Sequence, residues 1–206
     1  MNRPEVKIER IITYRRVLLK LNKEGQKNIF SHKLANNCQV SSAQVRRDLM
    51  DIGYTGSPAR GYEIAELLKS IGEFIDPDKK QGIALVGLGN LGRSIIDYFN
   101  GQSLKLEITA LFDKNPDKIN RVIAGCHSYH INELKDIITG NNIKIAVISV
   151  PSADAQKVAD VLVDGGIKGI LNYAPIILKV PDTIYVQNRD MITTLEKVSY
   201  FANNNK

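Results

Sequence analysis

The segment VGLGNLGRS, residues 86–94, constrains the fold of this chain more than any other stretch. It contains Gly87, Gly89 and Gly92 in the spacing G-x-G-x-x-G, after a short apolar run and before a segment with helical spacing of apolar residues. Between a strand and a helix, the first glycine permits a tight turn, the second lets a phosphate approach the backbone, and the third lets the helix pack closely. The segment therefore predicts the phosphate-binding turn of a dinucleotide-binding domain.

An acidic residue stands where such a domain needs one. Asp113 ends the run LEITALFD, 21 residues after Gly92, where a carboxylate accepts hydrogen bonds from ribose hydroxyls. The carboxylate would repel the 2′-phosphate of NADP(H) and favour NAD(H), although the adjacent Lys114 weakens that preference. The predicted cofactor-binding residues of this region are Gly87, Leu88, Gly89, Asn90, Leu91, Gly92, Asp113 and Lys114.

From residue 82 onward, short apolar segments alternate with amphipathic ones. Strands are predicted at residues 83–87, 106–113, 143–151, 168–175 and 183–188, and helices at residues 90–99, 131–140, 152–166 and 189–202. This alternation, with β-branched residues in the strands, is typical of an α/β fold with a Rossmann-type, doubly wound parallel sheet covered on both faces. The length of residues 81–206 suffices for one such domain, so we expect no separate substrate domain.

The first 80 residues have a helical pattern instead. Helices are predicted at residues 8–25, from Ser31 as N-cap, at residues 42–52 and at residues 65–75. Ser41 and Gln44 have the spacing of a capping box at the start of the third helix. The run YTGSPARGYEI predicts a turn between two short extended pieces, and DPDKKQG predicts a linker. Three helices followed by such a turn are typical of a winged helix-turn-helix domain.

The excess positive charge lies in this first segment. Residues 1–80 contain 15 lysine and arginine residues against 10 aspartate and glutamate residues, a net charge of +5, whereas residues 81–206 have a net charge of +1. A basic domain joined to a nearly neutral one favours a polyanionic partner such as double-stranded DNA. In the segment SSAQVRRDLMDIG, glutamine could pair with adenine and arginine with guanine in the major groove. The predicted DNA contacts are Ser42, Gln44, Arg46, Arg47 and, in the turn, Arg60.

Composition and short motifs indicate the compartment in which the protein is expected and the partners it is expected to lack. No apolar run reaches the roughly 18 residues of a membrane span, and the N-terminus lacks the apolar core of a secretory signal, so we expect a cytoplasmic protein without a membrane partner. Two cysteines, Cys38 and Cys126, fit a reducing compartment. The run GCHSYHI, with His127 and His130 near Cys126, matches no zinc-binding spacing, so we expect no metal site.

No strong catalytic constellation accompanies the predicted cofactor site, which favours a nucleotide that is sensed rather than consumed. Three other classes stay open. A small NAD-dependent oxidoreductase would need a proton-transfer residue near the nicotinamide. A CoA-binding module with a helical interaction domain is disfavoured by Asp113, because the ribose of CoA carries a 3′-phosphate. An N-terminal domain that binds protein rather than DNA is disfavoured by its charge.

Over nearly its whole length, the chain resembles the Rex-type redox-sensing transcriptional repressors of bacteria. The resemblance rests on the order and spacing of the segments RPEVKIERIITYRRVL, SSAQVRRDL, RGYEIAELL, ALVGLGNLGRSIIDY, ALFDKNPDKI, ISVPSADAQKVADVL, GIKGILNYAPIIL and NRDMITTLEKVSYF. The chain departs from the family in the turn of the wing. The family usually has GxRGVGY there, whereas this chain has TGSPARGY with Pro58 in the turn.

The resemblance implies a homodimer that binds palindromic operators of respiratory and fermentative genes. NADH would release it from DNA, while NAD⁺ would compete and permit binding. Residues 1–80 would form the winged-helix DNA-binding domain, residues 81–188 the Rossmann NAD(H)-binding domain, and residues 189–206 a C-terminal helix exchanged between subunits. The protein would be a regulator and not an enzyme.

The resemblance also assigns further residues. Residues that match segments lining the cofactor cleft are Val150, Pro151, Asn172, Ala174 and Pro175. A polar set of Arg16, Tyr98 and Asp190 matches residues that link the helices, the nucleotide pocket and the exchanged helix, and Tyr98 is expected near the cofactor.

Overall fold

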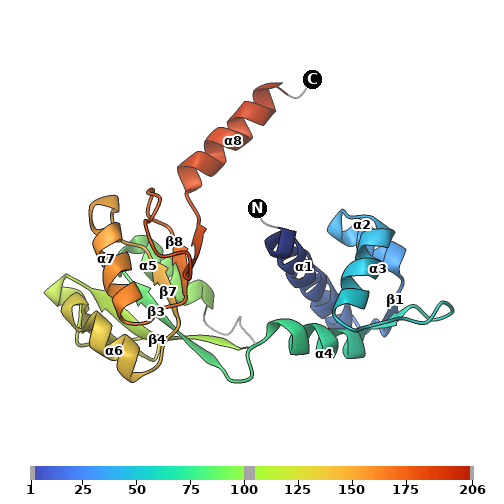
Figure 1. Ribbon diagram of the computed structural model, residues 1–206, viewed down its shortest axis with the longest axis horizontal. Helices are drawn as coiled ribbons and strands as arrows, with labels where there is room; N and C mark the ends of the chain where they lie inside the picture. Colours follow the sequence, from blue (N-terminus) through green and yellow to red (C-terminus); the bar gives the residue numbers. More distant parts are fainter. Residues whose placement is uncertain (1–2, 100–104, 205–206) are drawn as a thin grey trace. The chain divides into compact units, whose positions relative to one another are not determined.

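The chain forms two compact units, Met1–Asp78 and Lys79–Lys206, in a computed structural model that describes residues 3–99 and 105–204 (Figure 1). Residues 1, 2, 205 and 206, which belong to the predicted DNA-binding and C-terminal segments, lie outside the described residues. Each unit has its own hydrophobic core. No helix in the described ranges is long and apolar enough to span a lipid bilayer.

Unit 1 is a small helical domain with a two-stranded antiparallel sheet. Its elements are α1 (Arg3–Lys23), β1 (Asn28–Ile29), α2 (Ser31–Cys38), α3 (Ser42–Asp51), β2 (Tyr62–Glu63) and α4 (Ile64–Ile75). Its core contains, among others, Ile11, Tyr14, Leu18, Leu34, Val45, Leu49, Leu67 and Ile71. The prediction of an N-terminal winged helix-turn-helix arrangement is confirmed by structural relatives described below.

Two local predictions in unit 1 need correction. The N-cap of α2 is Phe30, and Ser31 is the first helical residue, so the predicted serine cap is absent. The extended piece after the turn pairs with β1, which the sequence did not predict, and the turn itself holds only a bridge between Ser57 and Gly61. Gly61 adopts φ +72°, and a Cβ there would lie 2.5 Å from the carbonyl oxygen of Ile29, which explains why glycine stands at this crossing.

The start of α3 agrees only in part with the capping box predicted from the sequence. Ser41 is the N-cap, and its hydroxyl accepts a hydrogen bond from the backbone amide of Gln44 at 3.1 Å. The reciprocal half of the predicted capping box is wrong, because the side chain of Gln44 donates to Asp48 at 2.8 Å instead. Asp48 lies one turn further along α3, so the glutamine amide turns along the helix rather than back towards its start.

Unit 2 is built on a seven-stranded sheet in the order β5-β6-β4-β3-β7-β8-β9. The strands are β3 (Gln81–Val86), β4 (Leu106–Asp113), β5 (Val122–Ile123), β6 (Cys126–His130), β7 (Ile145–Ile148), β8 (Gly169–Asn172) and β9 (Tyr185–Asn188). All neighbours pair in parallel except β5 and β6, which are antiparallel. Without β5, the order is that of a doubly wound dinucleotide-binding sheet, so the predicted fold class is confirmed.

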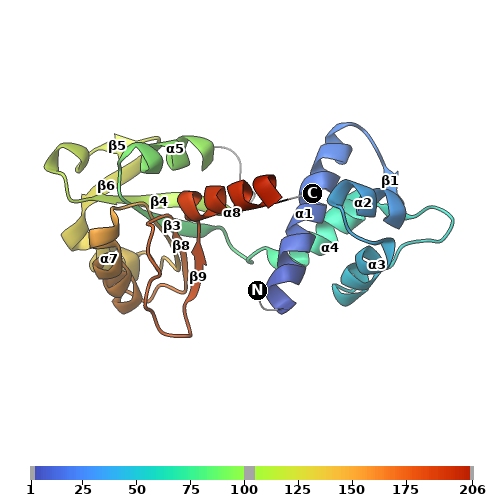
Figure 2. The same cartoon turned by 90° about the horizontal axis from the view of Figure 1, so that it is seen from above.

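Helices cover both faces of this sheet (Figure 2). The helix α5 (Asn90–Phe99) contributes Ile96 to the cluster on one face, with Leu85 and Leu111 of the strands. The helices α6 (Leu134–Gly140) and α7 (Ser152–Asp164) contribute Leu134 and Leu162 to the cluster on the other face. Short 3₁₀ turns, η1 (Pro116–Lys118) and η2 (Ile131–Glu133), lie in the connections.

The sequence did not predict the hairpin of β5 and β6, because β6 is largely polar. Its central Ser128 is fully buried. The Ser128 hydroxyl donates to the carbonyl oxygen of Arg121 at 2.9 Å and accepts from the amide of Arg121 at 3.1 Å. These bonds satisfy a buried serine in a strand that has no apolar alternation.

The last helix, α8 (Met191–Asn204), extends beyond the end of β9, and every residue in it is exposed (Figure 1). Its start is capped by Asp190, whose carboxylate accepts from the Thr193 hydroxyl at 2.6 Å and the Ile192 amide at 3.0 Å. These donors, the Thr193 hydroxyl first, hold the pKa of Asp190 below its usual value. One side of α8 carries an apolar stripe formed by Met191, Leu195, Val198 and Ala202.

Candidate functional site

Two of the three glycines after β3 are sterically required in the structure, and the third leaves space beside the backbone. Gly87 adopts φ +101°, and a Cβ there would lie 2.7 Å from the carbonyl oxygen of Ser149. A Cβ at Gly92 would overlap the carbonyl oxygen of Gly87, so the first turn of α5 packs directly on the loop. A Cβ at Gly89 would meet nothing within 4 Å, which leaves open space above the backbone. Such a loop, at a helix N-terminus with free amide groups, can hold a pyrophosphate.

Asp113 supports this loop from the end of β4. The residue is 9% exposed, and Oδ2 accepts a hydrogen bond from the backbone amide of Leu88 at 2.7 Å. Oδ1 accepts from the backbone amide of Asn115 at 2.8 Å, and the Nζ of Lys118 lies 3.6 Å from Oδ2. A carboxylate has about four acceptor positions, so Asp113 retains capacity for ribose hydroxyls while it orders the glycine loop.

The end of β7 supports the loop from the other side. The Ser149 hydroxyl donates to the carbonyl oxygen of Gly87 at 2.9 Å, and the Ser149 amide donates to the carbonyl oxygen of Val86 at 2.9 Å. The strands β3 and β7 are neighbours at the point where the strand order reverses, which is where doubly wound sheets bind ligands. The loop is thus anchored at this switch point by a serine that sequence reasoning did not select.

A cavity of about 860 Å³ opens at this edge of the sheet. It is lined by Val86, Gly87, Gly89, Asp113, Lys114, Asn115, Lys118, Ile131, Asn132, Leu134, Ser149, Val150, Pro151, Asp154, Lys157, Val158 and Val161. Its size is in the upper part of the range for cofactor pockets, and its walls combine apolar side chains with a few polar groups. The residues therefore fit a dinucleotide.

Six of the residues predicted to bind the cofactor line this cavity, and they come from the ends of three strands: Gly87, Gly89, Asp113, Lys114, Val150 and Pro151. Two others lie under the loop, because Leu88 is fully buried and Gly92 packs against Gly87. Asn90 and Leu91 are exposed on the first turn of α5. Tyr98 is 70% exposed on α5 and does not line the cavity.

The predicted residues after β8 do not line the cavity either. Asn172 is fully buried, and its amide nitrogen donates to the carbonyl oxygens of Ala174 at 3.1 Å and Ile176 at 2.9 Å. It also donates to Oδ1 of Asn188 at 2.9 Å. The side chain therefore holds the loop after β8 together, while Ala174 is buried and Pro175 is exposed.

Besides Ser149, five polar side chains of the cavity wall were missed by sequence reasoning: Asn115, which is the N-cap of η1, and Lys118, Asn132, Asp154 and Lys157. They come from η1, η2 and the first two turns of α7, elements that carry no recognisable motif. The Nζ of Lys114 lies 2.7 Å from Oδ2 of Asp154. This contact raises the pKa of Lys114 and lowers that of Asp154.

The predicted switch residues are in accessible positions. Arg16 is exposed on α1, and no hydrogen bond or ion pair of its side chain is found among the described residues. Tyr98 is exposed on α5, and Asp190 is the N-cap of α8. The proposed link between these three residues stays a prediction.

The candidate DNA-binding face lies on α3 and the following turn. Arg46 and Arg47 are exposed on α3, and Arg60 is exposed in the turn. The Nη1 of Arg46 donates to the hydroxyl of Ser31 at 3.3 Å. A groove of about 400 Å³ separates α3 from the turn, and Pro58 is part of its wall.

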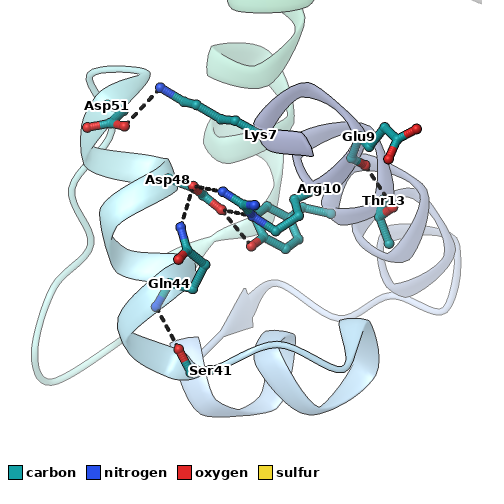
Figure 3. A network of polar contacts seen from close by, with 9 residues as sticks. Lys7, Glu9, Arg10, Thr13, Ser41, Gln44, Asp48 and Asp51 are labelled. Carbon is teal, nitrogen blue, oxygen red and sulfur yellow. Dashed lines mark hydrogen bonds and ion pairs between the residues drawn. The ribbon is translucent and has the colours of Figure 1, made fainter. Parts of the chain in front are cut away.

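A buried polar network fixes α3 against α1 (Figure 3). Arg10 donates from Nε and Nη2 to the two carboxylate oxygens of Asp48, each at 2.7 Å, and the Tyr14 hydroxyl donates to Oδ2 at 2.9 Å. Gln44 completes the set through its amide nitrogen. Burial alone would raise the pKa of Asp48, but the donors, Arg10 first, hold it below its usual value. Burial, and then the contact with Asp48, raises the pKa of Tyr14.

This network bears on the role predicted for Gln44. Bidentate pairing with adenine requires both the amide nitrogen and the amide oxygen of glutamine. The nitrogen is already a donor to Asp48, and the side chain is half-buried. Arg46 and Arg47 are exposed on α3, whereas Gln44 and Ser42 are half-buried, and the contacts of all four residues with DNA stay predictions.

The histidines near Cys126 have local roles. The imidazole of His130 is the N-cap of η2 and accepts a hydrogen bond from the amide of Asn132 at 3.2 Å. The ring of His127 contacts that of Tyr129 with their centroids 4.5 Å apart. Within residues 3–99 and 105–204, no three His, Cys, Asp or Glu side chains are grouped so as to hold a metal ion.

Known proteins resemble both units. A family model described as "Putative DNA-binding protein N-terminus" matches residues 4–49, and one described as "CoA binding domain" matches residues 78–176. A redox-sensing transcriptional repressor Rex from Lactobacillus acidophilus is 36% identical over 203 residues, which are 98% of this chain and 96% of the relative.

Solved structures give the same relationship. The crystal structure of RSP in complex with β-NAD⁺ and operator DNA has a TM-score of 0.90 and 33% identity, and the match covers 98% of this chain and 93% of that chain. The structure of RSP in complex with β-NADH has a TM-score of 0.85 and 32% identity, with coverage of 98% and 94%. RSP is itself described as a Rex-family repressor. Because the resemblance extends over both units at this level of identity, the chain belongs to the Rex family of redox-sensing transcriptional repressors.

Proposed function

We propose that this protein is a DNA-binding transcriptional repressor that senses the ratio of NADH to NAD⁺. Unit 1 holds a palindromic operator, and NADH in the cavity of unit 2 releases it. The observation that carries the proposal is the cavity with its glycine loop and Asp113, on a chain whose relative RSP binds NAD⁺, NADH and operator DNA. The relative from Lactobacillus acidophilus is named a transcriptional repressor, which favours a regulator over the oxidoreductase alternative.

Different residues of the cavity would contact different parts of the nucleotide. Gly89 leaves room for the pyrophosphate, the N-terminus of α5 offers amide donors, and Asp113 accepts from ribose hydroxyls. Val150 and Pro151 add an apolar wall. An apolar surface disfavours the positive charge of an oxidised nicotinamide, so it favours the reduced form.

On the DNA side, the exposed guanidinium groups of Arg46 and Arg47 can reach base edges or phosphates from α3, and Arg60 can reach them from the turn. Such contacts suit a protein that works on the chromosome in the cytoplasm. The positive charge of residues 1–80 adds a salt-dependent attraction to the phosphate backbone.

The proposal includes a homodimer, in which α8 of each chain packs against the partner. A palindromic operator has two-fold symmetry, which a dimer with two recognition helices matches. In the single chain, Leu195 and Val198 of the apolar stripe are 61% and 59% exposed, so the helix lacks the packing that normally stabilises it. A second copy of the chain would supply that packing.

We expect Leu195→Asp to convert the dimer into a monomer, because a carboxylate would replace an apolar contact in the stripe. Analytical ultracentrifugation over a range of concentrations measures this change. Lys197→Asp introduces the same side chain on the opposite side of α8 and serves as the control. Equal association of both variants and the wild type would show that the stripe does not form the interface.

The function is tested by operator release. The operator is first selected by the protein from a random DNA library, and the labelled duplex is then titrated by fluorescence anisotropy. We expect NADH to weaken binding by about 5- to 150-fold relative to NAD⁺, the range of ordinary allosteric coupling. Because one family model is described as a CoA binding domain, CoA is tested in parallel. Release by CoA and not by NADH would replace the proposed ligand.

A further inference from the structure

The end of β4 presents an acid and a base in succession, Asp113 and Lys114. In dinucleotide-binding sheets, an acid at this place favours NAD(H), whereas a nearby cation accommodates the 2′-phosphate of NADP(H). The two residues therefore favour opposite cofactors. The selectivity of the site depends on whether Lys114 is available.

The structure shows where Lys114 is held. Its Nζ lies 2.7 Å from Oδ2 of Asp154, which is in the first turn of α7, and both side chains line the nucleotide cavity. Asp154 is 35% exposed and Lys114 is 69% exposed, so the pair is at the open side of the cavity. The raised pKa of Lys114 and the lowered pKa of Asp154 are consistent with this pairing.

We propose that Asp154 is a specificity-determining residue that keeps the cavity selective for NADH over NADPH. It does so by occupying Lys114 and by adding a second carboxylate, besides Asp113, to the cavity wall. The inference rests on the proposed function, because it concerns the same cavity. It extends that function to a residue of α7 that belongs to no nucleotide-binding motif.

The charges of the two side chains, and not the strength of the ion pair itself, provide the discrimination, because the carboxylate of Asp154 offsets the cation of Lys114. An exposed ion pair contributes little, so a 2′-phosphate could break it at small cost. The carboxylate of Asp154 would remain in the wall, however, and would repel a phosphate group of nearly two negative charges. Without Asp154, three lysines of the wall, at positions 114, 118 and 157, would face the single carboxylate of Asp113.

The test is the ratio of NADPH affinity to NADH affinity, measured by nicotinamide fluorescence titration of the full chain. We expect Asp154→Asn to raise this ratio about tenfold, because it removes one close repulsive charge and frees Lys114. Asp160→Asn is the matched control. Asp160 is an exposed aspartate further along α7 that bonds to Gln156 and does not line the cavity, so its replacement should leave the ratio within about twofold.

A double variant identifies the cation. In Asp154→Asn combined with Lys114→Gln, the ratio should return close to that of the wild type. A ratio unchanged in Asp154→Asn, or a gain retained in the double variant, would overturn the proposal. Failure of the proposed function has a different signature, because the wild type would then not bind NADH or would not release operator DNA when it does.

Discussion

Replacing Asp113 by asparagine is expected to lower the affinity for NADH by about 10- to 150-fold, the effect of losing a hydrogen bond to a charged group. The carboxylate stands at the end of β4 and retains acceptor positions besides those used by the amides of Leu88 and Asn115. Asparagine has one acceptor oxygen where aspartate has two, so ribose hydroxyls would lose a partner. Nicotinamide fluorescence titration measures the change.

The control for this prediction is Asp117→Asn, which removes an exposed carboxylate from η1 without touching the cavity wall. NADPH separates loss of a ribose contact from collapse of the loop. Asp113→Asn also removes a charge that repels the 2′-phosphate, so NADPH affinity should fall much less than NADH affinity. An equal loss for both cofactors would mean that Asp113 acts only by supporting Leu88.

Replacing Asp48 by alanine is expected to destabilise unit 1 by about 2 to 4 kcal/mol, because it leaves Arg10 without its partner. The side chain of Asp48 is 2% exposed and that of Arg10 is 23% exposed. Water therefore reaches the arginine in part, which makes the expected loss smaller than for a fully buried ion pair. A domain of this size has a stability of about 4 to 12 kcal/mol. Hydrogen exchange of peptides from α1 and α3 measures the loss for this unit separately.

Asp51→Ala is the matched control, since Asp51 also lies on α3 and also bonds to a basic residue of α1 (Figure 3). Its ion pair with Lys7 at 2.8 Å is exposed, so its loss should cost less than about 1 kcal/mol. Similar exchange in both variants would show that the buried network does not hold the helices together.

The same network predicts how stability depends on pH. Because the pKa of Asp48 is lower in the folded chain than its unfolded value, its contribution is present above about pH 4 and is lost as the pH falls through the folded value. Asp48→Ala lacks this contribution. The difference in stability between wild type and variant should therefore shrink in acid, which the exchange measurement can follow.

The nucleotide site could be predicted from the sequence to the extent that it depends on local geometry. Gly87 and Gly92 are required by a turn and a close contact that their own motif defines, and Asp113 follows the next buried strand at the usual interval. The alternation of strands and helices predicted the doubly wound sheet correctly, because each strand and helix also has its own local pattern of residues. These features are encoded within short segments.

The other parts of the site depend on contacts between distant segments. Asp154 and Lys114 are 40 positions apart in the sequence, and their side chains are in contact only because the fold brings the start of α7 beside the end of β4. Asp48 is buried because Arg10 and Tyr14 reach it from α1, and it also accepts a hydrogen bond from the side chain of Gln44. No local pattern of apolar residues reports such pairs, so only the fold reveals them.

The central claim is that the cavity of unit 2 and the DNA-binding face of unit 1 are energetically coupled, and reciprocity tests it most directly. If NADH weakens operator binding by a given factor, operator DNA must weaken NADH binding by the same factor. The measurement is the affinity for NADH with and without saturating operator duplex. We predict an operator-dependent loss of about 5- to 150-fold that equals the loss of operator affinity caused by NADH. An NADH affinity that is the same with and without operator would contradict the account.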